Sequence, residues 1–129
     1  MGKIKKFEDI EAWKRARELT KTIYELTDKG LLARDFGLRD QLRRSSLSIM
    51  ANIAEGFERG GDKEFRQFLA IAKGSVGELK AQLYVALDAD LITSERFSSL
   101  SALADETSRL IAGFMRYLKQ SVHQGSKYK

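Results

Sequence analysis

The chain contains no proline in 129 residues, and this absence constrains its fold more than any other feature. Proline breaks helices and is common in turns, so a sequence without it favours long, uninterrupted helices over a strand-and-turn fold. A chain of this length is one domain by the usual size range and can bury an ordinary hydrophobic core. The chain also lacks cysteine, so neither a disulfide nor a thiolate metal site can support the fold.

Apolar residues recur every three or four positions along four segments, which predicts four amphipathic helices. The helices are predicted at residues 8–29, 36–55, 62–89 and 95–122, and the tails 1–6 and 123–129 are predicted to be flexible. Short connections between four helices predict an all-α fold, an antiparallel up-down-up-down four-helix bundle.

Small and polar residues between the segments predict where the helices end and begin. Gly56, which is followed by an aromatic residue, predicts the end of the second helix. Residues 60–62, a Gly-Gly-Asp sequence, predict a turn and an N-cap for the third helix. Thr93 or Ser94 is expected to cap the fourth helix.

The net charge of +5 is concentrated at the two ends of the chain. Of the 23 Lys and Arg residues, five lie before residue 8 or after residue 121, which leaves 18 against the 18 Asp and Glu residues. The body of the domain is therefore neutral, although basic residues can still gather on one face. No apolar run is long enough to span a membrane, and no secretory signal precedes the domain, so the expected location is the cytoplasm.

Two of the predicted helices carry a second apolar face, on the side opposite the core. Glycines in the middle of a solvated helix cost about 1 kcal/mol each relative to Ala, so small residues there suggest that another backbone approaches closely. These faces predict an oligomer interface, because large exposed apolar patches mark interaction sites. The alternative is that both faces pack inside the monomer. The predicted interface residues are Leu47, Met50, Ala51, Ala54, Ala70, Gly74, Gly77, Ala81 and Val85.

The sequence offers few groups for catalysis. Its single histidine, His123, lies in or after the last predicted helical turn, where a solvated tail residue is the simpler interpretation. Di-iron bundles need Glu-x-x-His pairs, which the sequence lacks, and none of its serines has a histidine positioned to activate it. We therefore predict that the protein is not an enzyme and has no catalytic residue, cofactor or metal site.

A polar stripe runs along the otherwise apolar second helix. Its members are Gln41, Ser48, Asn52 and Glu55. We interpret the stripe as a structural hydrogen-bond network, because satisfied polar groups between helices fix their register. Two alternatives are a small binding site and a simple role for Asn52 and Glu55 at the helix end.

Basic residues line up on two of the predicted helices. Arg39, Arg43 and Arg44 cluster on the second helix, and Arg66, Lys73 and Lys80 repeat every seven residues along the third. Lines of cations on a helix are candidates for contacts to nucleic-acid phosphates. A solvated flank is the alternative interpretation. No aromatic residue is interleaved among these cations to stack on bases, so we expect little sequence readout.

Several motifs, taken together, resemble a known family over about residues 7–121. They are Phe7–Ile10 with Trp13 and Ala16, Phe36–Ser45, Ser48–Ile49, Asn52–Gly56, Glu64–Phe65, Phe68–Leu69, Ala72–Ser75, Glu78–Leu79 and Gln82–Leu83. On these residues the chain resembles the four-helix-bundle family named for open reading frames inside intervening sequences of bacterial 23S ribosomal RNA genes. The accessory variability protein of diversity-generating retroelements is in the same group. Where that family usually has Gly-Tyr-Ile, this chain has Asp90-Leu91-Ile92.

The resemblance implies a four-helix bundle that assembles into a ring, typically a homopentamer. For the retroelement branch it also implies binding to nucleic acid and to a reverse transcriptase, whereas the molecular function of most of the family is not known. We therefore expect a non-enzymatic, homo-oligomeric adaptor that binds DNA or RNA through basic surfaces. The alternative is a structural or protein-interaction oligomer with no role in nucleic-acid binding.

Overall fold

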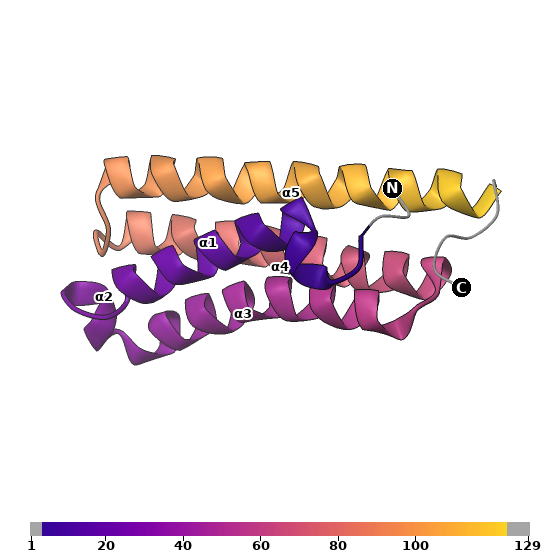
Figure 1. The fold of residues 1–129 in the computed structure, drawn as a ribbon. Helices are drawn as coiled ribbons and strands as arrows, with labels where there is room; N and C mark the ends of the chain where they lie inside the picture. The colour runs from indigo at the N-terminus through magenta and orange to yellow at the C-terminus, as the bar shows by residue number, and fades with distance from the viewer. Residues whose placement is uncertain (1–3, 124–129) are drawn as a thin grey trace.

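The computed structural model describes residues 4–123, with side chains described as far as residue 120, and it is a bundle of helices (Figure 1). The elements are the 3-10 helix η1 (Phe7–Asp9) and the α-helices α1 (Glu11–Leu26), α2 (Leu31–Arg34), α3 (Phe36–Arg59), α4 (Asp62–Asp88) and α5 (Ser94–His123). Within residues 4–123 there is no strand, so the predicted all-α class is confirmed. Most of the predicted flexible tails lie outside the described residues.

The four long helices lie side by side around one hydrophobic core (Figure 1). The most extensive contacts join α3 to α4 and α4 to α5, while α1 packs against both α3 and α5. Leu42 and Ile49 of α3 and Leu79 and Leu83 of α4 are completely buried. Each such side chain contributes roughly 1.5–3 kcal/mol through its removal from water, so the inward-facing stripes hold the bundle together.

The predicted first helix is wrong at both ends. Ile10 has an extended backbone (φ −77°, ψ 124°), and it separates η1 from α1. The break directs Ile10 into the core, where its side chain is 2% exposed. At the other end, the Thr27 hydroxyl donates to the Ile23 carbonyl at 2.7 Å just beyond α1. The short helix α2 follows, and it was not predicted.

Gly56 lies inside α3 and does not end it, so this prediction was wrong. The helix continues to Arg59 and stops at Gly60, whose φ of 88° is the left-handed conformation that glycine adopts without strain. A Cβ atom at Gly56 would lie 2.7 Å from both Phe65 Cδ1 and Phe68 Cβ. Glycine is required here because α3 and α4 approach too closely for any side chain.

The two predicted N-caps have different outcomes. Thr93 is confirmed as a cap, because its Oγ1 accepts a hydrogen bond from the Arg96 backbone N–H at 3.1 Å. The cap predicted within residues 60–62 falls on a glycine, which makes no side-chain hydrogen bond to the helix. Gly61 is the N-cap of α4, and Asp62 is the first residue inside the helix. The Asp62 carboxylate is 4% exposed and has no hydrogen-bond partner.

The end of α4 explains the departure from the family pattern at Asp90. The Asp90 N–H bonds to the Leu87 carbonyl at 3.0 Å, and the Leu91 N–H bonds to the Ala86 carbonyl at 2.8 Å. This pair of bonds is a Schellman motif, which places its C′ residue in the left-handed region. Asp90 occupies that position with φ 59°, where aspartate is better tolerated than most non-glycine residues. The motif is therefore kept without the glycine.

We predict that Gly56→Ala lowers the free energy of unfolding by about 1–3 kcal/mol, because the added methyl group overpacks the contact with α4. Gly113→Ala is the matched control, since its Cβ would meet only the flexible end of Arg116 at 3.6 Å. The control should raise stability by up to about 1 kcal/mol, because alanine is the better helix former. Urea denaturation of both variants at one protein concentration measures the difference, and equal effects would contradict the account of Gly56.

Candidate functional site

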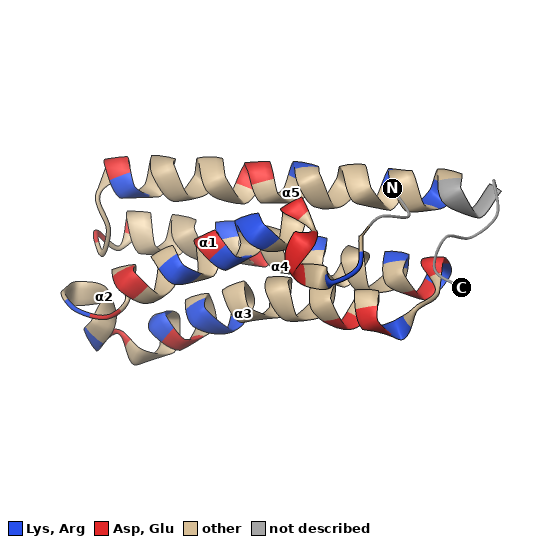
Figure 2. Ribbon diagram, in the orientation of Figure 1, with Lys and Arg blue, Asp and Glu red and all other residues tan. Residues whose placement is uncertain are grey.

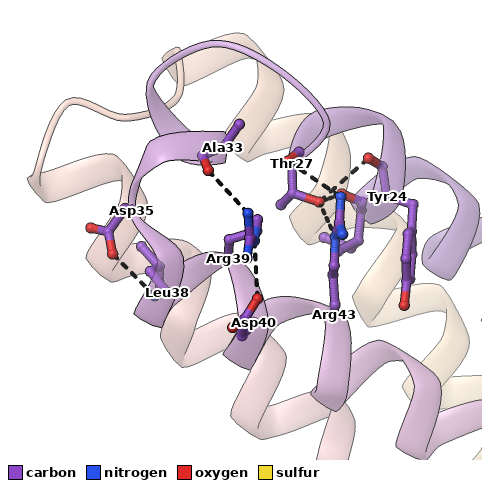
Figure 3. Close-up of polar contacts among 9 residues, drawn as sticks. Tyr24, Thr27, Ala33, Asp35, Leu38, Arg39, Asp40 and Arg43 are labelled. Atoms are coloured by element: carbon purple, nitrogen blue, oxygen red, sulfur yellow. Dashed lines mark hydrogen bonds and ion pairs between the residues drawn. The ribbon is translucent and has the colours of Figure 1, made fainter.

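Arg43, a predicted phosphate contact, belongs to the corner where α1, α2 and α3 meet (Figure 3). Its Nε donates to Thr27 Oγ1 at 2.8 Å, and its Nη2 donates to the Thr27 carbonyl at 3.3 Å. The guanidinium lies over the Tyr24 ring, 4.5 Å from the ring centroid. Arg43 therefore ties the end of α1 to α3.

Arg39 performs a similar task one turn earlier (Figure 3). Its Nη1 donates to the Ala33 carbonyl of α2 at 3.3 Å, and its Nε donates to Asp40 Oδ1 at 3.0 Å. Its guanidinium also covers the Phe36 ring at 4.8 Å. The third predicted arginine of this group, Arg44, is exposed and makes no hydrogen bond or ion pair with any described residue. Only Arg44 is left unengaged by the fold.

The three predicted cations on α4 also differ in their contacts within the chain. The Lys80 ammonium pairs with Asp105 Oδ1 of α5 at 2.5 Å, so it links two helices. Lys73 is exposed, and within residues 4–120 it has no ion-pair partner. Arg66 is half-buried and lies at the start of α4. The six predicted cations therefore do not form one patch, and Figure 2 shows acidic and basic residues interspersed along the helices.

A cleft of about 470 Å³ is lined by cations from two helices, which the sequence did not predict to lie together. It lies between the start of α4 and the end of α5, and Lys63, Arg66, Arg116 and Lys119 line it. No acidic residue lines the cleft. Arg66 was predicted as a phosphate contact, but the other three were missed. They lie on two helices about 50 positions apart, so spacing along one helix could not have found them.

The predicted polar stripe is partly a real network. Ser48 Oγ lies 2.8 Å from Ser75 Oγ of α4, and Asn52 Nδ2 donates to Ser48 Oγ at 3.1 Å. Gln41 is exposed and has no hydrogen-bond partner among the described residues. Ser48 and Asn52 are therefore joined to the buried Ser75, which the sequence analysis missed because it lies on another helix.

Glu55, the fourth member of the predicted stripe, belongs to a surface ion-pair cluster instead. It accepts a hydrogen bond from Arg59 Nη2 at 2.9 Å, and Arg59 Nη1 also donates to Glu64 at 3.0 Å. The hydrogen bond to Glu55 and the charge of Glu64 raise the pKa of Arg59 above its ordinary value. This cluster joins the end of α3 to the start of α4.

Most of the predicted interface residues are exposed in the single chain. Leu47 is 45% exposed and Val85 is 55% exposed. Ala51, Ala70, Gly74, Gly77 and Ala81 are exposed as well. Ile71 is 54% exposed and was missed, because it lies between Ala70 and the buried Ala72 in an apolar run, where the sequence alone does not separate exposed from buried residues. We call the outward-facing group Leu47, Ala51, Ala70, Ile71, Gly74, Gly77, Ala81 and Val85 the α3–α4 face.

Two predicted interface residues pack within the chain. Met50 and Ala54 are partly buried and lie against the hydrophobic core. The alternative of packing inside the monomer is therefore the better description for these two residues.

The family model described as "23S rRNA-intervening sequence protein" matches residues 8–113. The chain belongs to this family. A protein of unknown function from the S23 ribosomal protein family of Bacteroides thetaiotaomicron has a similar solved structure, with a TM-score of 0.75 and 22% sequence identity over 81% of this chain and 95% of that one. No curated protein sequence matches significantly.

The family match confirms the resemblance that the motifs predicted. The solved relative has the same fold. Among the side chains described, those of residues 4–120, no group of three or more His, Cys, Asp or Glu is arranged to hold a metal ion. None of the helices in this part of the chain combines the length and the apolar character needed to cross a membrane. His123 has no described side chain, so its predicted role remains a prediction.

Because Arg43 is held by contacts within the chain and Arg44 is not, substitution of these two neighbours should affect stability differently. Arg43→Gln should lower the free energy of unfolding by about 1–3 kcal/mol, because the partly buried acceptors of Thr27 lose their charged donor. Arg44→Gln removes the same charge from an exposed site and should change stability by less than about 0.5 kcal/mol. Thermal denaturation of the two variants checks this contrast, and an equal loss of stability would show that Arg43 has no structural role.

Proposed function

We propose that this protein is a non-enzymatic, homo-oligomeric adaptor that binds nucleic acid through basic surfaces. The observation that carries the proposal is that basic residues on outward-facing sides of α3 and α4 lack partners in an otherwise neutral body. Arg44 and Lys73 are exposed and make no ion pair with any described residue. Unpaired cations can exchange their counterions for phosphates, and the release of those ions drives binding.

In this proposal the subunit is an antiparallel up-down-up-down four-helix bundle. Contacts between α4 and α5 support this arrangement. Phe65 packs against Phe114, Lys80 pairs with Asp105, and Tyr84 packs against Phe97. The residue numbers rise on one helix as they fall on the other, which is the pattern of antiparallel neighbours.

The α3–α4 face supports assembly with further copies of the chain. Leu47, Ile71 and Val85 each expose about half of their surface, and small residues lie between them on α4. Exposed apolar side chains grouped in this way are unfavourable in water and mark interaction sites. Small residues allow the backbone of a second helix to approach closely. The ring-shaped pentamer and the reverse-transcriptase partner rest on the family resemblance, and both remain predictions.

One observation favours a second candidate, a structural oligomer with no role in nucleic-acid binding. Three of the six predicted phosphate contacts are engaged within the chain, namely Arg39, Arg43 and Lys80, so only half of them are available to nucleic acid. The two candidates share the assembly through the α3–α4 face and differ only in binding to nucleic acid.

Assembly is tested by Gly77→Glu, which places a charge on the α3–α4 face. A charge buried without a partner opposes association, so we expect light scattering to show a shift toward smaller species at micromolar concentration. Ala102→Glu introduces the same charge at an exposed position of α5 away from this face, and it should leave the mass unchanged. A wild-type protein that is monomeric under these conditions would contradict the proposed assembly.

Nucleic-acid binding is tested with labelled duplex DNA, single-stranded DNA and RNA of equal length. We expect affinity to fall steeply between about 50 and 200 mM salt and to depend little on sequence, because the contacts are to phosphates. Deletion of residues 1–6 and 125–129 should weaken binding without abolishing it, since the body supplies contacts of its own. If a gel-shift assay at 50 mM salt detects no binding to any of the three, the structural oligomer becomes the better account.

A further inference from the structure

The cleft between α4 and α5 brings together four cations, of which most have no partner within the described chain. Lys63, Arg116 and Lys119 are exposed, and none of them makes a hydrogen bond or an ion pair with a described residue. Glu64 follows Lys63 in the sequence, but its Oε2 pairs with Arg59 Nη1 at 3.0 Å. Four like charges around one cleft repel one another, so an anion there would relieve that repulsion.

Arg66 supplies a second, independent observation. Its Nε atom is buried and has no hydrogen-bond partner within the described residues. The rest of its guanidinium makes no hydrogen bond or ion pair there either, although Arg66 lines the cleft, so its remaining donors are unused. Asp62 lies one turn before Arg66, but it neither bonds to this guanidinium nor lines the cleft. An anionic acceptor therefore suits both the unused donors of Arg66 and the surrounding cations.

The rest of the lining suits a phosphate group attached to a larger molecule. Ala70 and Met115 provide apolar surface between the cations, and Gln67 adds an uncharged amide. The cleft volume of about 470 Å³ lies within the range of small-ligand sites, so it can admit a sugar together with its phosphate.

We propose that this cleft binds a backbone phosphate of nucleic acid, with Arg66 donating to a phosphate oxygen and Lys63, Arg116 and Lys119 neutralising its charge. This inference rests on the proposed function and names the place on each subunit where the contact is made. Arginine is suited to the role, because its planar group presents several donors to phosphate oxygens. No aromatic side chain among the described residues lines the cleft, so we expect this contact to carry no base readout.

The test compares two double variants that remove the same charge. Arg66→Gln/Arg116→Gln empties the cleft of its guanidinium groups. Arg34→Gln/Arg96→Gln removes two exposed arginines that have no ion pair with described residues and lie on α2 and at the start of α5. Fluorescence anisotropy with a labelled single-stranded oligonucleotide measures affinity over a series of salt concentrations. Circular dichroism and light scattering establish that both variants keep the fold and the mass of the wild type.

We expect the cleft variant to bind at least tenfold more weakly at 50 mM salt, with the slope of log affinity against log salt reduced by about 1–2. The control should bind within about threefold of the wild type, with its slope reduced by less than about 0.5. If Arg66→Gln/Arg116→Gln does not fold, Lys63→Gln/Lys119→Gln replaces it, since both lysines are exposed. A wild type that binds, with cleft and control variants equally affected, would overturn this inference alone. A wild type that binds no nucleic acid would overturn the proposed function as well.

Discussion

The close approach of α3 and α4 at Gly56 is the contact on which the rest of the arrangement depends. Without a side chain at this position, Phe65 fits under α3 and is almost completely buried. Phe65 in turn packs edge-on against Phe114 of α5, with the ring centroids 5.3 Å apart. Arg66 follows Phe65 directly, and Arg116 lies two residues after Phe114. The packing that joins the three helices therefore lies next to two of the cations that line the basic cleft.

The fold uses some of its cations internally and leaves others to solvent. Arg39 and Arg43 hold the corner between α1, α2 and α3, and Lys80 links α4 to α5. Arg44 and Lys73 have no such task within the described chain. Local geometry, and not net charge, thus determines which basic residues are available to a partner. A neutral body can therefore present separate basic surfaces.

Hydrophobic periodicity predicted the long helices well, because each buries one stripe of apolar residues. It gave a wrong prediction where the role of a residue depends on a side chain from another helix. Gly56 was interpreted as a helix end, since glycine serves both to end helices and to allow close packing, and only Phe65 and Phe68 distinguish the two uses. The extended residue Ile10 was missed because an isolated apolar residue fits a helical stripe equally well.

The candidate site shows the same limit. The sequence identified Arg66 but not Lys63, Arg116 or Lys119, because a cleft between antiparallel neighbours joins residues far apart in the chain. Likewise, the three arginines near the start of α3, at positions 39, 43 and 44, looked equivalent, although Arg43 is held by Thr27 and Tyr24. Their different surroundings come from α1 and α2, and α2 itself was not predicted.

The α3–α4 face and the basic cleft adjoin at Ala70, which belongs to both. Our central claim is that α4 contributes to two surfaces: the α3–α4 face, through which copies of the chain associate, and the basic cleft, which binds phosphate. Sedimentation velocity of the wild-type protein mixed with a labelled oligonucleotide, followed at the wavelength of the label, tests this claim most directly. The account predicts that the label sediments with a species several times heavier than the 14.6 kDa chain. A label that sediments free, or with a single chain, would contradict it.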